Sequence, residues 1–427
     1  MGAAGHVRPA KPFNGHNDLR RPGKLRACRD VLVSVDGAFV AGREGCLAVT
    51  RGLPGRYGKT DAPTPTRLSG IGTAGRTLVA VLLVGLIAYG LLAGAKAPLR
   101  GGDGRERGDA ALYRAIEGRV ANGENYYRAA AVEQRRRRYP LRPFPAVRPP
   151  TLAVLAALSG GPAVMIVVLR LLSLLAGGAF LWRVAGEGES ALVLGSVGLL
   201  LAATLTGFAQ PQLIWWHEWW AGLLVMLALA GWRPGRWWFS LGIALLAAMV
   251  RELAFPFIVV MALMALAERR RREALAWGLA GVGALALLAA HALAVSAVVS
   301  PADPASPGWA AAGGWRFLLG AARDGTLLVL LPVPVAAVLV PLALFGWASR
   351  RGPWSLRVAG LLGVWVVAFL LIGRPDNGYW GLLLGPLLTP GLAFAIPALR
   401  DLVRPARPAG QRGRFVLRKD YGSVHSS

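Results

Sequence analysis

Residues 161–182 read GPAVMIVVLRLLSLLAGGAFLW, an apolar block in which Arg170 is the only charged side chain. A helix needs about 20 predominantly apolar residues to cross the hydrocarbon core of a bilayer. The block has neither the two-residue alternation of a half-buried strand nor a polar helical face. Since backbone groups in lipid must be paired within their own segment, we expect a membrane-spanning helix here.

Similar blocks recur on both sides of this one and predict the fold class. The first begins at Thr77, and the others fall near 190–208, 213–230, 237–250, 253–267, 275–298, 326–347, 356–372 and 381–398. Composition agrees, because 55% of the 427 residues are hydrophobic and 16% are charged, against roughly 25% charged in soluble domains. We expect an all-α integral membrane protein with about ten transmembrane helices.

Basic residues set the expected orientation and domain organisation. The net charge is +26, but the Lys and Arg residues gather in the two tails and beside the apolar blocks, as the positive-inside rule requires. The expected partner is therefore the lipid bilayer and not nucleic acid. We expect a disordered basic cytosolic tail at 1–75, a polytopic domain at 76–400 in the inner (plasma) membrane, and a second basic cytosolic tail at 401–427.

The blocks 237–250 and 253–267 predict a hairpin. Arg233 and Arg236 precede the first block, and a basic run at 269–272 follows the second. Two basic ends on one apolar run place both ends in the cytoplasm, so the dipeptide Arg251-Glu252 lies at the outer surface.

A polar stretch at 96–150 is the expected large first outer loop, with short helices of its own. Its motifs are Asp109-Ala-Ala-Leu-Tyr113, Gly123-Glu-Asn-Tyr126-Tyr127, Tyr139-Pro140 and Arg148-Pro149-Pro150. Asp109 and Tyr113 are four residues apart, so they share one side of a helix that we expect to begin near Gly108. Asp109 is either a cap at the positive end of this helix or a general base or metal-binding carboxylate.

Other ionisable residues fall on the same expected face: His217, Glu218, Arg251, Glu252, Arg374 and Asp376. His217-Glu218 stands among four tryptophans, and is either part of an interfacial aromatic belt or a pair that reaches inward to a substrate. Arg251-Glu252 either closes the hairpin turn as an ion pair or provides a guanidinium for a phosphate. Arg374 and Asp376 lie in a Pro/Gly turn, where we expect them to contribute to substrate binding.

The ordered set of loop motifs resembles the first outer loop of GT-C-type glycosyltransferases, which are multi-pass enzymes that use a polyprenyl-phosphate-sugar donor. The resemblance covers residues 77–170 by motif and the rest by architecture. It implies that Asp109 is the catalytic carboxylate, and we assign Tyr113, Tyr126 and Tyr127 of the same loop to substrate binding. Ala110 stands where many relatives carry a second acid, and Asp103 is the nearest other candidate, which leaves a divalent metal cofactor open.

These observations predict a hexosyl- or pentosyltransferase that modifies an envelope acceptor on the outer face. Asp109 deprotonates or orients the acceptor hydroxyl, and Arg251 and Arg374 hold the leaving polyprenyl phosphate. Two alternatives stay open. A transporter or flippase of a lipid-linked or amphipathic substrate would show inverted repeats and broken helices, and a non-catalytic envelope scaffold would have outer-face polar residues that point apart.

Overall fold

The computed structural model describes residues 66–94, 105–207, 210–308 and 311–404, and three short strands nearer the N-terminus. The chain divides into two compact units, 1–60 and 61–427. In the first unit, β1 (Val31–Val35), β2 (Ala38–Arg43) and β3 (Cys46–Val49) form an antiparallel sheet in that order. The Val-rich β1 suits a strand, so this part differs from the disorder expected for 1–75. The other residues of 1–65, and the predicted tail beyond Arg404, lie outside the described residues.

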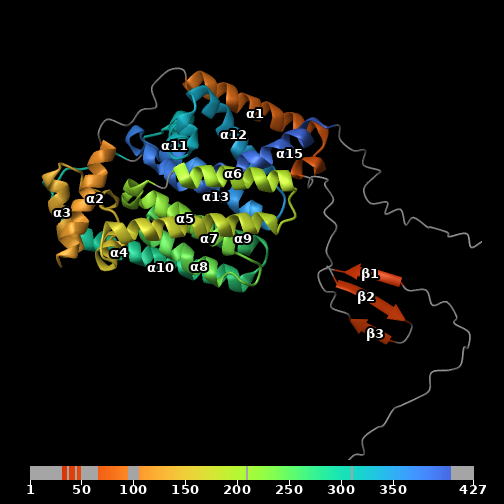
Figure 1. Ribbon diagram of the computed structural model, residues 1–427, viewed down its shortest axis with the longest axis horizontal. Coiled ribbons are helices and arrows are strands. Elements are labelled where there is room, and N and C mark those ends of the chain that lie inside the picture. The colour runs from red at the N-terminus through yellow and green to blue at the C-terminus, as the bar shows by residue number, and fades with distance from the viewer. Residues whose placement is uncertain are drawn as a thin grey trace, which may run out of the picture. The chain divides into compact units, whose positions relative to one another are not determined.

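Long apolar helices build the second unit (Figure 1). Four of those described are long and apolar enough to cross a membrane: α1 (Thr73–Gly94), α5 (Pro162–Ala185), α10 (Arg271–Ser296) and α13 (Pro353–Ile372). A bent pair near the C-terminus makes a fifth candidate when it is counted as one span. The described chain is thus a helical protein with four or five candidate membrane spans, fewer than the ten blocks counted in the sequence.

The difference in number arises because several apolar helices are shorter than a bilayer span. These are α6 (Ala191–Gly207), α8 (Trp238–Val250), α9 (Phe255–Ala267) and α12 (Val333–Ser349). The break between α8 and α9 falls at Arg251 and the 3-10 turn η4 (Glu252–Ala254), where the sequence predicted a break between two helices. The hairpin with both ends in the cytoplasm stays a prediction. In α7 (His217–Gly231), every side chain from His217 to Ala230 is buried. A helix that is apolar all round is one that runs through a core.

The last apolar block, predicted as one helix at 381–398, is bent. The turn η6 (Pro375–Trp380) continues into α14 (Gly381–Leu388), and α15 (Gly391–Val403) follows at an angle of 64°. Pro390 stands at the N-cap of α15 and supplies no backbone N–H, which favours a break in the helix here. The bent pair packs tightly against α11 (Gly314–Asp324), where a Cβ placed on Gly381 would lie 1.6 Å from the carbonyl oxygen of Ala321.

Three short helices between α1 and α5 pack together at one end of the bundle (Figure 1). They are α2 (Arg105–Ala121), α3 (Tyr126–Arg136) and α4 (Thr151–Ser159), with a 3-10 turn η2 (Phe144–Ala146) between the last two. The side-chain oxygen of Asn125 accepts hydrogen bonds from the N–H groups of Tyr127 and Arg128 and so caps α3. The expected short helices of the 96–150 loop are confirmed, and we call α2, α3 and α4 the helical cap.

Asp303 fastens the helical cap to the segment that follows α10. Arg135 of α3 donates two hydrogen bonds to the Asp303 carboxylate, each 2.7 Å long. The backbone N–H of Ser300 donates a third, also 2.7 Å long. Arg142 donates to the backbone oxygen of Asp303 through Nε and Nη2, at 3.0 and 2.8 Å. Arg135 and Arg142 therefore hold the cap to this segment.

An Asp303→Asn variant is expected to unfold about 2 °C below the wild type at neutral pH. Hydrogen bonds from Arg135 and from the Ser300 N–H lower the pKa of Asp303 from 3.8 to about 2. Because the pKa is lower in the folded state, the stabilisation is complete above about pH 4 and is lost as the pH falls through about 2. Thermal unfolding measured across that window should show the two curves converging in acid. A constant gap would contradict the assignment.

Candidate functional site

The candidate site is built around the first turn of α7. The 3-10 turn η3 (Pro211–Trp215) leads into it, and His217 and Glu218 enter the helix only 5% and 1% exposed. Trp220 donates from its indole nitrogen to the Ile214 carbonyl at 3.0 Å, which holds η3 on α7. All four tryptophans of this stretch are buried. This turn is consequently part of the protein core. It does not form the interfacial aromatic belt that was one of the two alternatives for His217-Glu218.

Glu218 is the centre of a buried ion network. Its Oε1 accepts a hydrogen bond from Arg251 Nε at 2.6 Å and lies 3.8 Å from Nη2 of Arg148. Arg251, 1% exposed, also pairs with Glu252. The Arg251-Glu252 ion pair that the sequence suggested therefore exists. Glu218 of α7 is a second carboxylate bound to the same arginine. The two carboxylates of the network oppose two guanidinium groups, which makes burial of these charges tolerable.

Arg148 is a site residue that the sequence analysis missed. Its Nη2 donates to the Tyr379 hydroxyl at 2.9 Å, and its guanidinium lies 5.7 Å from the centre of the Tyr379 ring. Its carbonyl accepts from the Tyr126 hydroxyl at 2.7 Å, while its Nε is buried without a hydrogen-bond partner. In the sequence, the Arg-Pro-Pro motif is the signal that could have pointed to this residue. Arg148 lies three residues before the start of α4.

Helix α2 carries Asp109 and Tyr113, and it brings Tyr113 into contact with His217. The Tyr113 ring packs edge-on against the His217 ring, with 5.1 Å between centroids. Burial raises the pKa of the Tyr113 hydroxyl; Arg148 opposes this shift, and Asp109, one helical turn earlier, adds to it. Because α2 begins at Arg105, Asp109 lies in its second turn. A role as N-cap, the structural alternative for this residue, does not fit that position.

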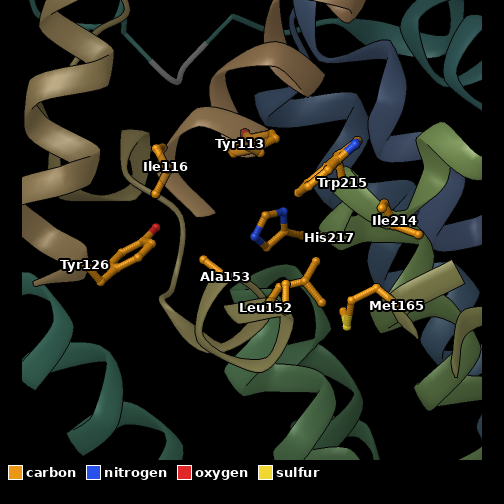
Figure 2. Close-up of a pocket in the computed structure, with 10 residues that line it drawn as sticks. Tyr113, Ile116, Tyr126, Leu152, Ala153, Met165, Ile214, Trp215 and His217 are labelled. Atoms are coloured by element: carbon orange, nitrogen blue, oxygen red, sulfur yellow. The ribbon is translucent and has the colours of Figure 1, made fainter. Parts of the chain in front are cut away.

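A cavity of about 20 Å³ lies where the helical cap meets α7. Figure 2 shows the His217 ring in the middle of the lining side chains, with Tyr113 and Tyr126 from the cap on one side and Trp215 on another. His217 Nδ1 is buried and has no hydrogen-bond partner. A space of this size holds about one water molecule.

The remaining predicted residues lie around this cluster. The Tyr127 hydroxyl is 3.3 Å from Nδ1 of His291 on α10, so it connects the cap to a long helix. Arg374 donates to both oxygens of Asp376 at 3.1 and 2.7 Å, and also to Ser306 Oγ and the Pro307 carbonyl. Arg374 is the N-cap of η6 and Asp376 lies within it, and the same turn supplies Tyr379 to Arg148.

Metal ligands in proteins are chiefly His, Cys, Asp and Glu side chains, and the described residues are 66–94, 105–207, 210–308 and 311–404 with the three strands. Within these ranges, no group of three or more His, Cys, Asp or Glu side chains is placed to hold a metal ion. Asp103, the second carboxylate considered from sequence, lies outside the described residues.

Fold and site together define a class: a helical protein with four or five candidate membrane spans and a buried polar cluster beneath a cap of short helices. Comparison with protein-family models, with curated proteins and with solved structures finds no match to this chain.

Proposed function

We propose that this chain is a membrane glycosyltransferase of the GT-C type, which transfers a sugar from a polyprenyl-phosphate donor to an envelope acceptor. The observation that carries the proposal is a convergence. Asp109, Tyr113 and Arg148 of the cap segment meet His217 and Glu218 of α7, and Arg251 and Tyr379 join them from two further segments. Buried charge is costly, so its concentration under one cap favours a site over a scaffold.

We propose an inner-membrane arrangement in which the shorter apolar helices complete a bundle of about ten. Both termini are then cytoplasmic and the helical cap lies outside. Two helix ends support this arrangement, the C-terminal end of α5 and the N-terminal end of α8. Trp182 and Trp238 are 77% and 66% exposed beside basic residues, as Arg183 follows Trp182 directly and Arg236 precedes α8. Exposed tryptophans with neighbouring arginines are typical of a cytoplasmic interface.

In the proposed reaction, Asp109 is the general base. The acceptor hydroxyl gives its proton to the Asp109 carboxylate while its oxygen forms a bond to the anomeric carbon of the sugar. The bond between that carbon and the phosphate oxygen breaks, and polyprenyl phosphate leaves with the electron pair. A single displacement of this kind inverts the anomeric configuration.

Arg148 is the guanidinium that we assign to the phosphate, in addition to the earlier expectation for Arg251 and Arg374. Arg251 is offset by Glu218 and Glu252, and Arg374 by Asp376. Arg148 has a buried Nε without a hydrogen-bond partner and a carboxylate only at 3.8 Å. Its Nη1 and Nη2 donate to neutral groups, the Pro145 carbonyl and the Tyr379 hydroxyl, and a guanidinium held in this way suits a phosphate oxygen.

Reconstitution into liposomes tests the proposed function. Purified protein is supplied with an envelope fraction as the acceptor and with polyprenyl-phosphate sugars labelled in the sugar, and both the label and the lipid are followed. The proposal requires loss of the sugar from the lipid with stoichiometric release of polyprenyl phosphate. If the intact donor instead crosses the bilayer without losing its sugar, the chain is a flippase and the proposal is wrong.

Arg148→Lys is expected to raise the KM for the lipid-linked donor about tenfold, because a lysine cannot reproduce the guanidinium bonds to both Tyr379 and a phosphate. The matched control is Arg128→Lys, since Arg128 is exposed on α3. Steady-state kinetics of the two variants against the wild type measures the difference. Equal KM values for all three proteins would remove Arg148 from the donor site.

A further inference from the structure

A second cavity, of about 230 Å³, lies near the other end of α5. Its wall includes Thr66 before α1, Glu187 and Glu189 between α5 and α6, and Arg350 and Arg351 between α12 and α13. Met165, near the start of α5, lines the first cavity. At 1.5 Å per residue, the helix from Met165 to Ala185 is about 30 Å long, so the second cavity is remote from the candidate site.

Two of the cations around this cavity are neutralised by its two carboxylates. Arg350, 7% exposed, donates from Nε to Glu189 Oε1 at 2.8 Å, and its guanidinium lies 4.9 Å from the centre of the Phe394 ring. Glu187 pairs with Arg183 at 2.6 Å. The wall formed by these side chains is therefore partly aromatic, and each of its two carboxylates is paired with an arginine.

Arg351 has a different environment. Its Nε donates to the Thr66 carbonyl at 2.9 Å and its Nη2 to Ser69 Oγ at 2.8 Å, and both acceptors are uncharged. No carboxylate of the described residues pairs with it. Thr66 is itself fixed, because its N–H and its hydroxyl both donate to Asp401 Oδ2, at 2.9 and 3.0 Å. Among the described residues, the exposed Arg351 guanidinium is thus held at the cavity by hydrogen bonds to neutral groups and by no carboxylate.

We propose that this cavity binds a phosphate ester through Arg351. A guanidinium held by neutral acceptors keeps its full charge for an anion, and its planar donors match phosphate oxygens. The volume of 230 Å³ is below the ~300 Å³ at which drug-sized ligand sites begin. It therefore selects a headgroup-sized ligand. Two sources carry this chemistry, the headgroup of an anionic phospholipid and a soluble phosphate ester.

Thermal unfolding in nanodiscs tests the proposal. The full chain is placed in phosphatidylcholine discs, in discs that also contain phosphatidylglycerol, and in phosphatidylcholine discs with added glycerol phosphate. We expect at least one of the two probes to raise the unfolding temperature of the wild type by about 2–4 °C. A rise with phosphatidylglycerol alone assigns the lipid as the source, and a rise with glycerol phosphate assigns a soluble ligand.

Variants attribute the shift to the cavity. Arg351→Gln is expected to abolish it and Arg351→Lys to retain part of it, while the control Arg272→Gln, at an exposed position on α10, keeps it in full. Should Arg351→Gln not fold, loss of half or more of the shift in Arg351→Lys supports the same assignment. The proposal is overturned if neither probe stabilises the wild type, or if the shift persists unchanged in the Arg351 variants.

Discussion

An Asp109→Asn variant is expected to transfer sugar about 10²–10⁴-fold more slowly than the wild type while remaining folded. Asparagine keeps the shape of the side chain, but its amide cannot accept the proton of an acceptor hydroxyl. Asp109 lies in the second turn of α2, away from the helix cap position and one turn before Tyr113, whose ring contacts His217. Its substitution therefore removes chemistry and leaves helix initiation intact. The turnover number in liposomes, with a labelled lipid-linked sugar, measures the effect.

The matched control for this experiment is Glu124→Gln. Glu124 lies in the same cap segment and pairs with Arg119 at 2.8 Å, but it does not line the cavity. The control removes the same charge from the same region and should change the rate by no more than about twofold, since exposed ion pairs contribute little. Full activity in a folded Asp109→Asn protein would sink the catalytic assignment.

Glu218→Gln is expected to lower the free energy of unfolding by about 3–5 kcal/mol, since it removes one partner of a buried ion pair. Both Glu218 and Arg251 are 1% exposed, and Arg148 Nη2 stands 3.8 Å from the same carboxylate oxygen. The substitution leaves two guanidinium groups with one carboxylate, that of Glu252, in a site that water reaches poorly. Denaturant titration in detergent, followed by tryptophan fluorescence, measures the loss.

A second variant separates the ion pair from simple loss of packing. Changing Glu218 and Arg251 together to methionine removes both charges and keeps much of the side-chain volume, so we expect it to recover most of the lost stability. Glu252 is then left without Arg251, but its side chain is 19% exposed and retains access to water. Arg148 loses the Glu218 carboxylate 3.8 Å away but keeps its hydrogen bond to Tyr379. A Glu218→Gln protein as stable as the wild type would show that the network does not hold the bundle.

Features that depend on local chemistry were predictable from the sequence. The block 161–182 corresponds to α5 at Pro162–Ala185, because a continuous apolar run has only the helix available to it in lipid. The break at Arg251 and the helix that carries Asp109 and Tyr113 follow in the same way from charge placement and i, i+4 spacing. In each case the deciding residues are neighbours in the chain.

Features that depend on distant contacts were not predictable. Arg148 meets Tyr379 across 231 positions of sequence, and nothing in the Arg-Pro-Pro motif specifies that partner. The tryptophans around His217 fit a membrane interface by composition, yet packing buries them. The 64° bend between α14 and α15 follows from Pro390 together with close packing on α11, and only the proline is visible in the sequence.

The most direct measurement is a structure of the protein in a lipid nanodisc with a non-transferable polyprenyl-phosphate-sugar analogue bound. The account expects the sugar beside Asp109, the phosphate within hydrogen-bond distance of Arg148, and α2 displaced from His217 to admit the ligand. A headgroup bound away from the contact between α2 and α7, with Asp109 facing no part of the sugar, would contradict it.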